Sequence, residues 1–155
     1  QKATDEFRGV FEKTAGRDGY VSLEVSPLLA HDTKKSLEEA RHLFSAVNRP
    51  NLMIKIPGTR EGLPAIEQAL TEGISINITL LFGMERYAEV ANIYLKALEK
   101  RVADGKPIDK VASVASVFVS RIDTLVDKKL DALGAAGAAL LEQKGVVPAV
   151  AFDLQ

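Results

Sequence analysis

Apolar and polar residues recur along the chain with two periods, of about 2 and about 3.6 residues. The shorter period is typical of strands and the longer one of amphipathic helices. Strands are predicted at residues 20–25, 52–56, 74–82, 111–119 and 145–152. Helices are predicted at residues 2–13, 32–47, 63–71, 84–103 and 124–133. The pattern therefore predicts one helix followed by alternating strands and helices.

Residues that favour turns and helix ends separate these elements. Asp32 or Thr33 can cap the second helix, Gly73 can close the third, and Pro57-Gly58 stops the second strand. Alternating strands and helices at this spacing predict a parallel sheet. Two α/β architectures are compatible with it. One is an open doubly wound sheet, and the other is a (β/α)8 TIM barrel of roughly 250 residues, of which this chain would supply about five βα units.

The polar positions within the predicted strands favour the barrel. In the third strand, Ser75, Asn77 and Thr79 share one face, and apolar residues occupy the other. Comparable polar positions in the other strands are Ser22, Glu24, Lys55, Ser116 and Ser120. An open sheet with helices on both sides has two apolar faces, whereas a barrel can place polar groups in its lumen, near the C-terminal ends of the strands. A sheet with one face in solvent is the alternative.

The composition of the chain argues against several kinds of partner and indicates no particular function. At 155 residues, 46% hydrophobic and 26% charged, the chain is expected to form one soluble domain, a partial barrel over residues 1–155. A net charge of −1 does not suggest a nucleic-acid or membrane partner. The absence of cysteine fits a reducing compartment, so a cytoplasmic location is expected. The first residue is glutamine, not methionine, which fits an excised or processed chain.

The sequence shows no motif for a metal or a cofactor. His31 and His42 lack the spacing of metal ligands, and neither a Walker loop nor a GxGxxG segment is present. We therefore expect an activity, if there is one, that needs neither.

Lys55 is the unusual residue, because it interrupts an apolar strand one residue before that strand ends. Burial disfavours the ammonium form of lysine and favours the neutral amine, which can attack a carbonyl and form a Schiff base. Glu24, in the preceding strand, could carry protons for such a reaction. The alternatives are a lysine that protects a strand edge and a structural ion pair between the two residues.

Three further residues could bind a substrate. Asn77 and Thr79 can hold a hydroxyl group or a water molecule. Arg121, just past the fourth strand, could bind a phosphate through its planar guanidinium group. Its alternative interpretation is a solvated cation in a loop.

Four segments together resemble the transaldolases, Schiff-base-forming enzymes of the pentose phosphate pathway. They are Val-Ser-Leu-Glu-Val at 21–25, Leu-Met-Ile-Lys-Ile-Pro at 52–57, Gly-Ile-Ser-Ile-Asn-Ile-Thr-Leu-Leu-Phe at 73–82 and Ser-Val-Phe-Val-Ser-Arg at 116–121. They occur in the family's order and with suitable spacing. The resemblance covers about residues 1–133.

The resemblance implies a transfer of a dihydroxyacetone unit from fructose 6-phosphate or sedoheptulose 7-phosphate to an aldose phosphate. It implies that Lys55 forms the Schiff base and that Glu24 and Thr79 hold the water that moves protons. Asn77 and Ser116 would bind polar groups of the substrate, and Arg121 its phosphate. Sugar phosphates are the expected partners, and a homo-oligomer is compatible with this interpretation.

The chain also departs from the family pattern. Val117 and Ser120 stand where proline and glycine are usual, and residues 135–155 match no segment of the family. No strand before residue 20 carries the family's catalytic aspartate or its second-strand asparagine. This chain alone is therefore expected to be inactive. Two other interpretations stay open: a Schiff-base aldolase of the same fold that acts on a smaller sugar phosphate, and an inactive scaffold whose lysine is structural.

Overall fold

The computed structural model describes residues 1–134. Its elements, in chain order, are α1 (Lys2–Glu6), α2 (Arg8–Lys13), β1 (Val21–Glu24), a 3-10 turn η1 (Pro27–Leu29), α3 (Thr33–Val47), β2 (Leu52–Pro57), α4 (Gly62–Glu72), β3 (Ile76–Leu81), α5 (Met84–Ala103), β4 (Ser113–Val117) and α6 (Val119–Ala132). The predicted last strand at 145–152 lies outside the described residues.

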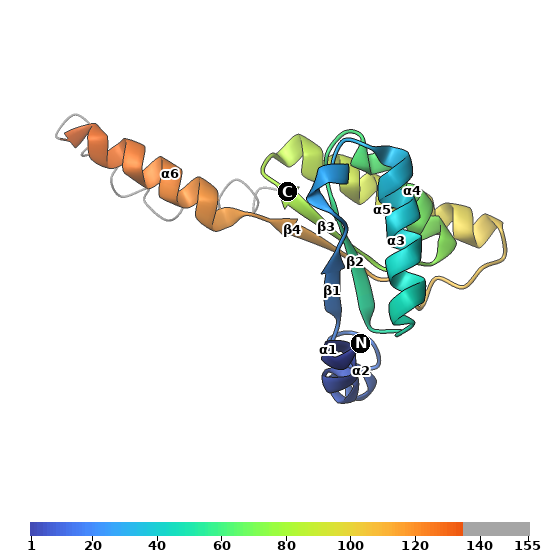
Figure 1. The fold of residues 1–155 in the computed structure, drawn as a ribbon. Coiled ribbons are helices and arrows are strands. Elements are labelled where there is room, and N and C mark those ends of the chain that lie inside the picture. Colours follow the sequence, from blue (N-terminus) through green and yellow to red (C-terminus); the bar gives the residue numbers. More distant parts are fainter. Residues whose placement is uncertain (135–155) are drawn as a thin grey trace.

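The four strands form one parallel sheet, and they follow one another in the sheet in the order β1-β2-β3-β4. Helices α3, α4 and α5 lie together on one side of this sheet (Figure 1). A doubly wound sheet instead reverses its strand order and carries helices on both faces. Strands in chain order with helices on one side are what a segment of a (β/α) barrel requires. The predicted α/β class with parallel strands is confirmed.

The hydrophobic core lies between the sheet and these helices. Its largest fully buried side chains come from the two central strands and from α4, and they are Leu52, Ile54, Ile56, Ile66, Leu70, Ile76, Ile78 and Leu81. Complete burial of a side chain of this size stabilises the fold by about 1.5–3 kcal/mol. Because this core takes one face of each strand, the opposite face is left for other side chains.

The predicted ends of α3, α4 and α5 are confirmed to within one residue. Asp32 caps α3 by accepting the backbone N–H of Lys35 at 3.0 Å, and α3 ends at Asn48 in the left-handed conformation, with φ 47°. Gly73 ends α4 with φ 96°, a conformation that glycine adopts without strain. Helix α5 covers the predicted range 84–103.

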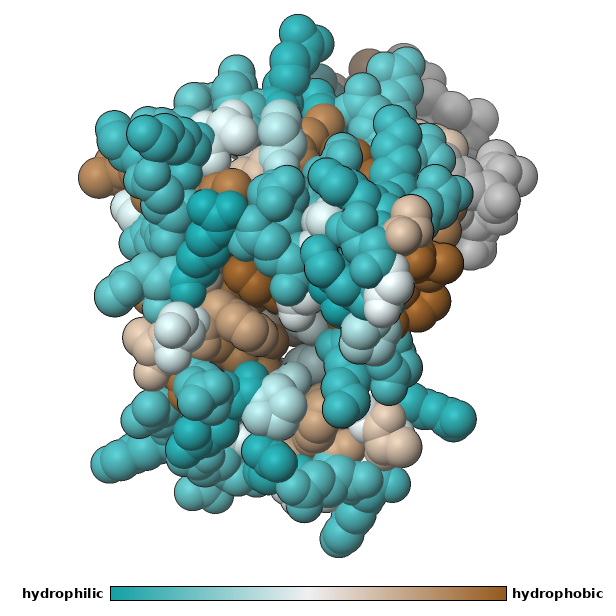
Figure 2. Space-filling model, turned by 90° about the vertical axis from the view of Figure 1, so that its right-hand side faces the viewer, coloured by the Kyte–Doolittle hydropathy of each residue, from teal (hydrophilic) through white to brown (hydrophobic). Residues whose placement is uncertain are grey.

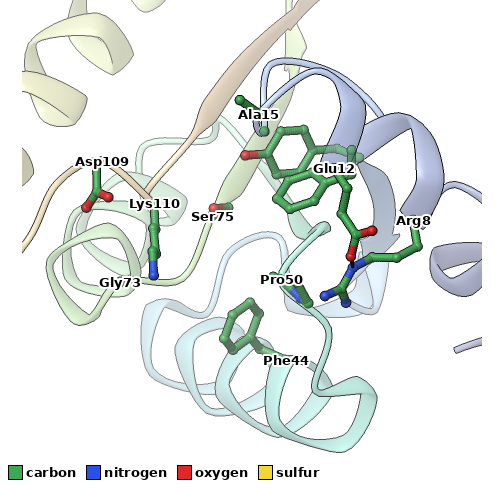
Figure 3. A pocket seen from close by; sticks show the side chains of 12 residues that line it. Arg8, Glu12, Ala15, Phe44, Pro50, Gly73, Ser75, Asp109 and Lys110 are labelled. Atoms are coloured by element: carbon green, nitrogen blue, oxygen red, sulfur yellow. Dashed lines mark hydrogen bonds and ion pairs between the residues drawn. The ribbon is translucent and has the colours of Figure 1, made fainter.

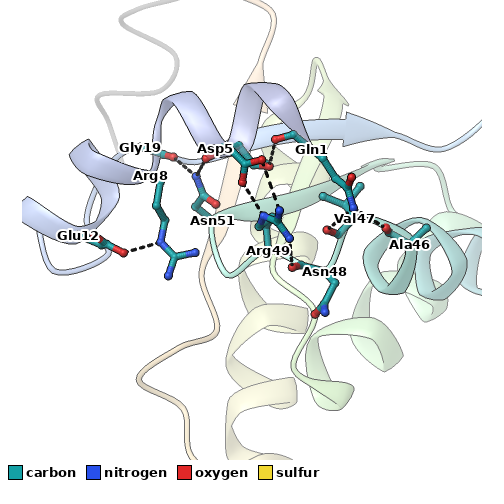
Figure 4. A network of polar contacts seen from close by, with 11 residues as sticks. Gln1, Asp5, Arg8, Glu12, Gly19, Ala46, Val47, Asn48, Arg49 and Asn51 are labelled. Atoms are coloured by element: carbon teal, nitrogen blue, oxygen red, sulfur yellow. Dashed lines mark hydrogen bonds and ion pairs between the residues drawn. The ribbon is translucent and has the colours of Figure 1, made fainter.

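The N-terminal helices are attached to the loop between α3 and β2 (Figure 4). The Arg49 guanidinium group binds the Asp5 carboxylate, with 2.6 Å between Nε and Oδ1. The buried Asn51 side chain donates to the carbonyl of Thr4 at 2.8 Å and to that of Gly19 at 3.0 Å. These bonds hold α1 and the turn before β1 against the N-terminal end of β2.

Several elements differ from their predictions: three strands are shorter, and one predicted helix is two helices. The predicted helix at 2–13 is two short helices that meet at Phe7, and the 3-10 turn η1 was not predicted. The predicted strands at 20–25, 74–82 and 111–119 are shorter in the structure, at 21–24, 76–81 and 113–117. Apolar residues continue past the positions where neighbouring strands pair, so the pattern alone overestimates strand length.

The predicted alternation in the third strand fails at Leu80. This residue has φ 60°, and the pairing of β3 with β4 shifts between Ile78 and Leu81. An extra residue of this kind is a β-bulge, and it turns the next side chain to the other face. Leu81 therefore enters the core, whereas Leu80, which was predicted to face it, is 40% exposed.

Helix α6 begins earlier than predicted and extends away from the sheet (Figure 1). The prediction was a helix at 124–133, but α6 starts at Val119, with only Phe118 between it and β4. Connections that reverse a strand into a packed helix usually need 2–6 residues, so a single residue cannot return α6 to the sheet. Ser120 and Arg121 consequently lie in the first turn of a helix and not in a strand or a loop.

The side of the molecule seen in Figure 2 is largely hydrophilic, with apolar side chains gathered in a hollow near its middle.

Within residues 1–134, no helix combines the length and the apolarity that crossing a bilayer requires.

An ion pair between α3 and α4 gives a prediction about stability at low pH. Arg41 binds both oxygens of Glu72, at 2.8 Å and 2.5 Å. This contact lowers the pKa of Glu72 from its ordinary value of 4.5. A carboxyl group whose pKa is lower in the folded state stabilises the fold at pH values above its unfolded-state pKa. That stabilisation is lost as the pH falls through the folded-state pKa.

We expect Glu72→Gln to lower the thermal midpoint at pH 7, with the difference from the parent protein shrinking as the pH falls below about 4.5. Thermal unfolding at a series of pH values measures this. Glu67→Gln, in the same helix, removes an equal charge from a residue outside the Arg41 contact and is the control. A Glu72→Gln deficit that stayed constant from pH 7 to about pH 3 would contradict the linkage.

Candidate active site

The face of the sheet opposite the core carries Lys55 at its centre. Lys55 lies on β2, Glu24 is its partner in register on β1, and Asn77 is its partner on β3. Parallel pairing thus puts an amine, a carboxylate and an amide at one level of three neighbouring strands. The Lys55 Nζ lies 3.5 Å from the Glu24 Oε2.

Both side chains of this pair are partly exposed to solvent. The Lys55 side chain is 27% exposed and that of Glu24 is 47% exposed, so a small molecule can reach both groups. At this separation, slightly longer than a direct hydrogen bond, one bridging water molecule can carry a proton between the carboxylate and the amine. The residues suit a nucleophile with an adjacent proton carrier, and the ion pair also fits the structural alternative.

Asn77 is hydrogen-bonded to serines of two other strands, β1 and β4. Its Nδ2 donates to the Ser22 Oγ on β1 at 3.0 Å, and its Oδ1 accepts from the Ser116 Oγ on β4 at 2.7 Å. The structure thus brings together two predicted residues, Asn77 and Ser116. Ser22 had been recognised only as a polar position in its strand and not as a site residue. Sequence reasoning missed this role because the partner of Ser22, Asn77, is 55 residues away in the sequence.

Thr79 lies one step closer to the C-terminal end of β3, in register with Pro57. It is fully buried, and its Oγ1 has no hydrogen-bond partner among the described residues. An unpaired buried hydroxyl costs roughly 1–3 kcal/mol. A bound water molecule would remove that cost, because it can both donate to and accept from the hydroxyl.

Arg121 lies at the C-terminal end of the strands but apart from the other candidates. Its guanidinium carbon is 4.6 Å from the centre of the Phe118 ring, and that ring stacks on Phe82 at 5.4 Å. Within residues 1–134, no hydrogen bond or ion pair joins Arg121 to the other five predicted site residues. Arg121 lies in the first turn of α6 and not in a loop, but its side chain is exposed, so the alternative of a solvated cation stays open.

A hollow of about 530 Å³ is lined by residues near the N-terminal ends of the strands (Figure 3), and Lys55 is not among them. Its walls come from α2, the end of α3 and the loop before β4, and they include Phe11, Tyr20, Phe44 and Lys110. Arg8, at its edge, is bound to Glu12 at 2.6 Å. Because the hollow is at the N-terminal ends of the strands, it does not contain the predicted chemistry.

No group of three or more His, Cys, Asp or Glu side chains in the described part of the chain could hold a metal ion. The arrangement around Lys55 relies on an amine, a carboxylate, an amide and hydroxyl groups. A parallel sheet in chain order, with these groups opposite its helix-covered face, defines a (β/α)-barrel protein with a candidate lysine site.

Comparison with known proteins identifies the family. A family model described as "Transaldolase/Fructose-6-phosphate aldolase" matches residues 1–151. The chain belongs to the transaldolase/fructose-6-phosphate aldolase family, whose fold is the TIM barrel. The match extends past residue 133, so the shorter extent expected from the four motifs was an underestimate.

Relatives in several bacteria are named transaldolase. The chain is 54% identical over 133 residues to the transaldolase of Saccharopolyspora erythraea, covering 86% of this chain and 36% of that protein. It is 50% identical over 137 residues to transaldolase 2 of Nostoc sp., covering 88% and 36%. It is 46% identical over 147 residues to the transaldolase of Frankia alni, covering 95% and 40%. The chain thus spans little more than a third of the length of these relatives.

Proposed function

We propose that this chain is part of a transaldolase and supplies the lysine that forms the Schiff base. Residues 1–155 would form one part of a (β/α)8 barrel, with Lys55 in its lumen. The observation that carries the proposal is the placement of Lys55, 3.5 Å from Glu24, on the face of the sheet opposite the core. The family and the relatives named transaldolase support the same reaction.

The proposed reaction begins when the neutral Lys55 amine attacks the ketone carbon of fructose 6-phosphate or sedoheptulose 7-phosphate. Loss of water gives a protonated imine, which draws electrons from the neighbouring carbon–carbon bond. Removal of the proton from the C4 hydroxyl then breaks the C3–C4 bond and releases an aldose phosphate. The three-carbon unit stays on Lys55 as an enamine.

Transfer is completed by the reverse steps with a second aldose phosphate. The enamine carbon attacks the acceptor aldehyde, the new alkoxide takes up a proton, and water hydrolyses the imine. Glu24 would move protons through a water molecule held by Thr79, whose buried hydroxyl has no protein partner among the described residues. Asn77 and Ser116 would bind hydroxyl groups of the substrate.

The family description includes a second reaction, the cleavage of fructose 6-phosphate without an acceptor. Transfer is favoured here because the relatives at 46–54% identity are named transaldolase. Activity within the pentose phosphate pathway, in the cytoplasm and on sugar phosphates, follows from the same proposal.

Trapping of the intermediate tests the proposed function. The full-length protein is incubated with fructose 6-phosphate and borohydride, which reduces an imine to a stable secondary amine. Mass spectrometry of the peptides should find the three-carbon or six-carbon adduct on Lys55. An adduct on a different lysine, or none, would exclude the proposal.

Arg121 provides a separate prediction about the phosphate. We expect Arg121→Ala to weaken the binding of fructose 6-phosphate by about 1.5–3 kcal/mol, the size of one charged hydrogen bond. Its effect on dihydroxyacetone, which has no phosphate, should be small. Inhibition constants for both ligands measure this, with Lys128→Ala, an exposed site further along α6, as the control. Equal losses for the two ligands would show that Arg121 does not bind phosphate.

A further inference from the structure

Ser22 is the one member of the hydrogen-bonded group around Asn77 that has no role in the proposed reaction. It lies on β1, two residues before Glu24, and its partner in register on β2 is Met53. Its Oγ accepts the Nδ2–H of Asn77 at 3.0 Å. Since Asn77 pairs in register with Lys55, the bond runs diagonally from the lysine level to the level below it.

The length of this bond, compared with the distance between the two strands, indicates where the Asn77 side chain lies. Neighbouring strands are about 4.8 Å apart, so β1 and β3, which flank β2, are separated by roughly 9.6 Å. A direct 3.0 Å hydrogen bond between them requires the Asn77 amide to extend across β2. It crosses that strand between the levels of Met53 and Lys55, and the register places Asn77 at the level of the lysine.

The other end of the amide is held as well. Ser116 on β4 donates to the Asn77 Oδ1 at 2.7 Å, so one hydroxyl group binds the oxygen and another binds the nitrogen. An asparagine amide has two N–H groups and an oxygen. With one N–H bound to Ser22, the second N–H is left to donate to a molecule attached to Lys55.

We propose that Ser22 is a positioning residue for the Schiff-base reaction, acting through Asn77. This inference rests on the proposed function. The Ser22 hydroxyl holds the Asn77 amide over β2, so that its second N–H points to an oxygen of the intermediate on Lys55. Without that hydroxyl the amide can rotate about its side-chain bonds, and the donor is no longer held in place as charge develops on the substrate.

The experiment is a double-mutant cycle in the full-length protein, with transfer from fructose 6-phosphate to erythrose 4-phosphate as the assay. We expect Ser22→Ala to lower kcat about tenfold and to change KM less than about threefold, because the donor acts after the substrate is bound. In the Asn77→Ala background, Ser22→Ala should lower kcat less than about twofold, since its target has been removed.

Ser45→Ala, at an exposed position of α3, is the matched control and should leave kcat within about twofold of the parent. The inference is overturned if Ser22→Ala lowers kcat equally in the presence and absence of the Asn77 side chain. It is also overturned if a lower thermal midpoint accompanies the loss and additives that restore folding restore kcat, which is what a purely structural role produces.

Borohydride trapping in the parent protein separates this inference from the proposed function. If no adduct forms on Lys55, the proposed function fails, and the role of Ser22 fails with it. If the adduct forms while the two substitutions act additively, only the positioning role fails.

Discussion

Replacing Lys55 by alanine in the full-length protein is expected to lower the rate of transfer by about 10⁴-fold or more, the scale of loss when a covalent nucleophile is removed. In the proposed reaction this substitution removes the amine that would attack the ketone, so no covalent intermediate could form. Steady-state assays with fructose 6-phosphate and erythrose 4-phosphate measure the loss.

Lys55→Arg distinguishes this chemistry from a structural ion pair. Arginine keeps a positive charge beside Glu24 but stays protonated and does not form a Schiff base. We expect Lys55→Arg to be as inactive as Lys55→Ala, with a thermal midpoint closer to that of the parent. The control is Lys34→Ala, an exposed lysine of α3, which should retain activity. Substantial turnover by either Lys55 variant would refute the nucleophile assignment.

The second large effect is expected for the 155 residues expressed alone, which should transfer at least 10²–10⁴-fold more slowly than the full-length protein. That range is the usual contribution of one positioned acid–base group. The family resemblance assigns such a group to an aspartate on a strand that precedes the glutamate strand, and no described strand precedes β1.

The open sheet adds to this loss. In the described residues β1 and β4 each pair on one side only, so the sheet has two edges, and the face with Lys55 is open to water. Unpaired strand edges also promote association between chains. We therefore expect the isolated chain to associate, with Leu28, Leu80 and Phe82 among its exposed apolar residues.

Transfer assays on the two proteins, with the association state checked by light scattering, measure this prediction. Adding back the remaining part of the full-length protein as a separate chain is a useful companion, because recovery of the rate would show that the missing strands supply the lost groups. Turnover by a verified monomer of residues 1–155 within about tenfold of the full-length protein would falsify it.

The sequence predicted helices α3, α4 and α5 best. Helix α5 and the caps at Asp32 and Gly73 agree with the structure because helix formation depends on contacts within a few residues. The strand cores around Lys55 and Asn77 were also predicted, the first from an apolar run that Pro57-Gly58 ends and the second from a two-residue period. Strand ends were less certain, because they depend on where a neighbouring strand stops.

The bulge at Leu80 and the start of α6 could not be predicted from such local patterns. Leu80 continues an apolar run, and only the pairing of β3 with β4 shows that one residue is extra. The segment before Thr124 reads as a connection, yet α6 already begins at Val119. Both outcomes depend on contacts, or a lack of contacts, with segments distant in the sequence.

For the candidate site, the chemical groups and their strands follow from local sequence: the lysine of β2, the glutamate of β1, and the polar face of β3. Which of these groups meet depends on the fold. The parallel register puts Glu24 and Asn77 at the level of Lys55. The hydrogen bond from Asn77 to Ser22 exists only because side chains from β1 and β3 converge over β2. Side-chain type and period are properties of the chain near each residue, whereas register and convergence depend on how distant strands pair, and that is settled by packing of the whole sheet.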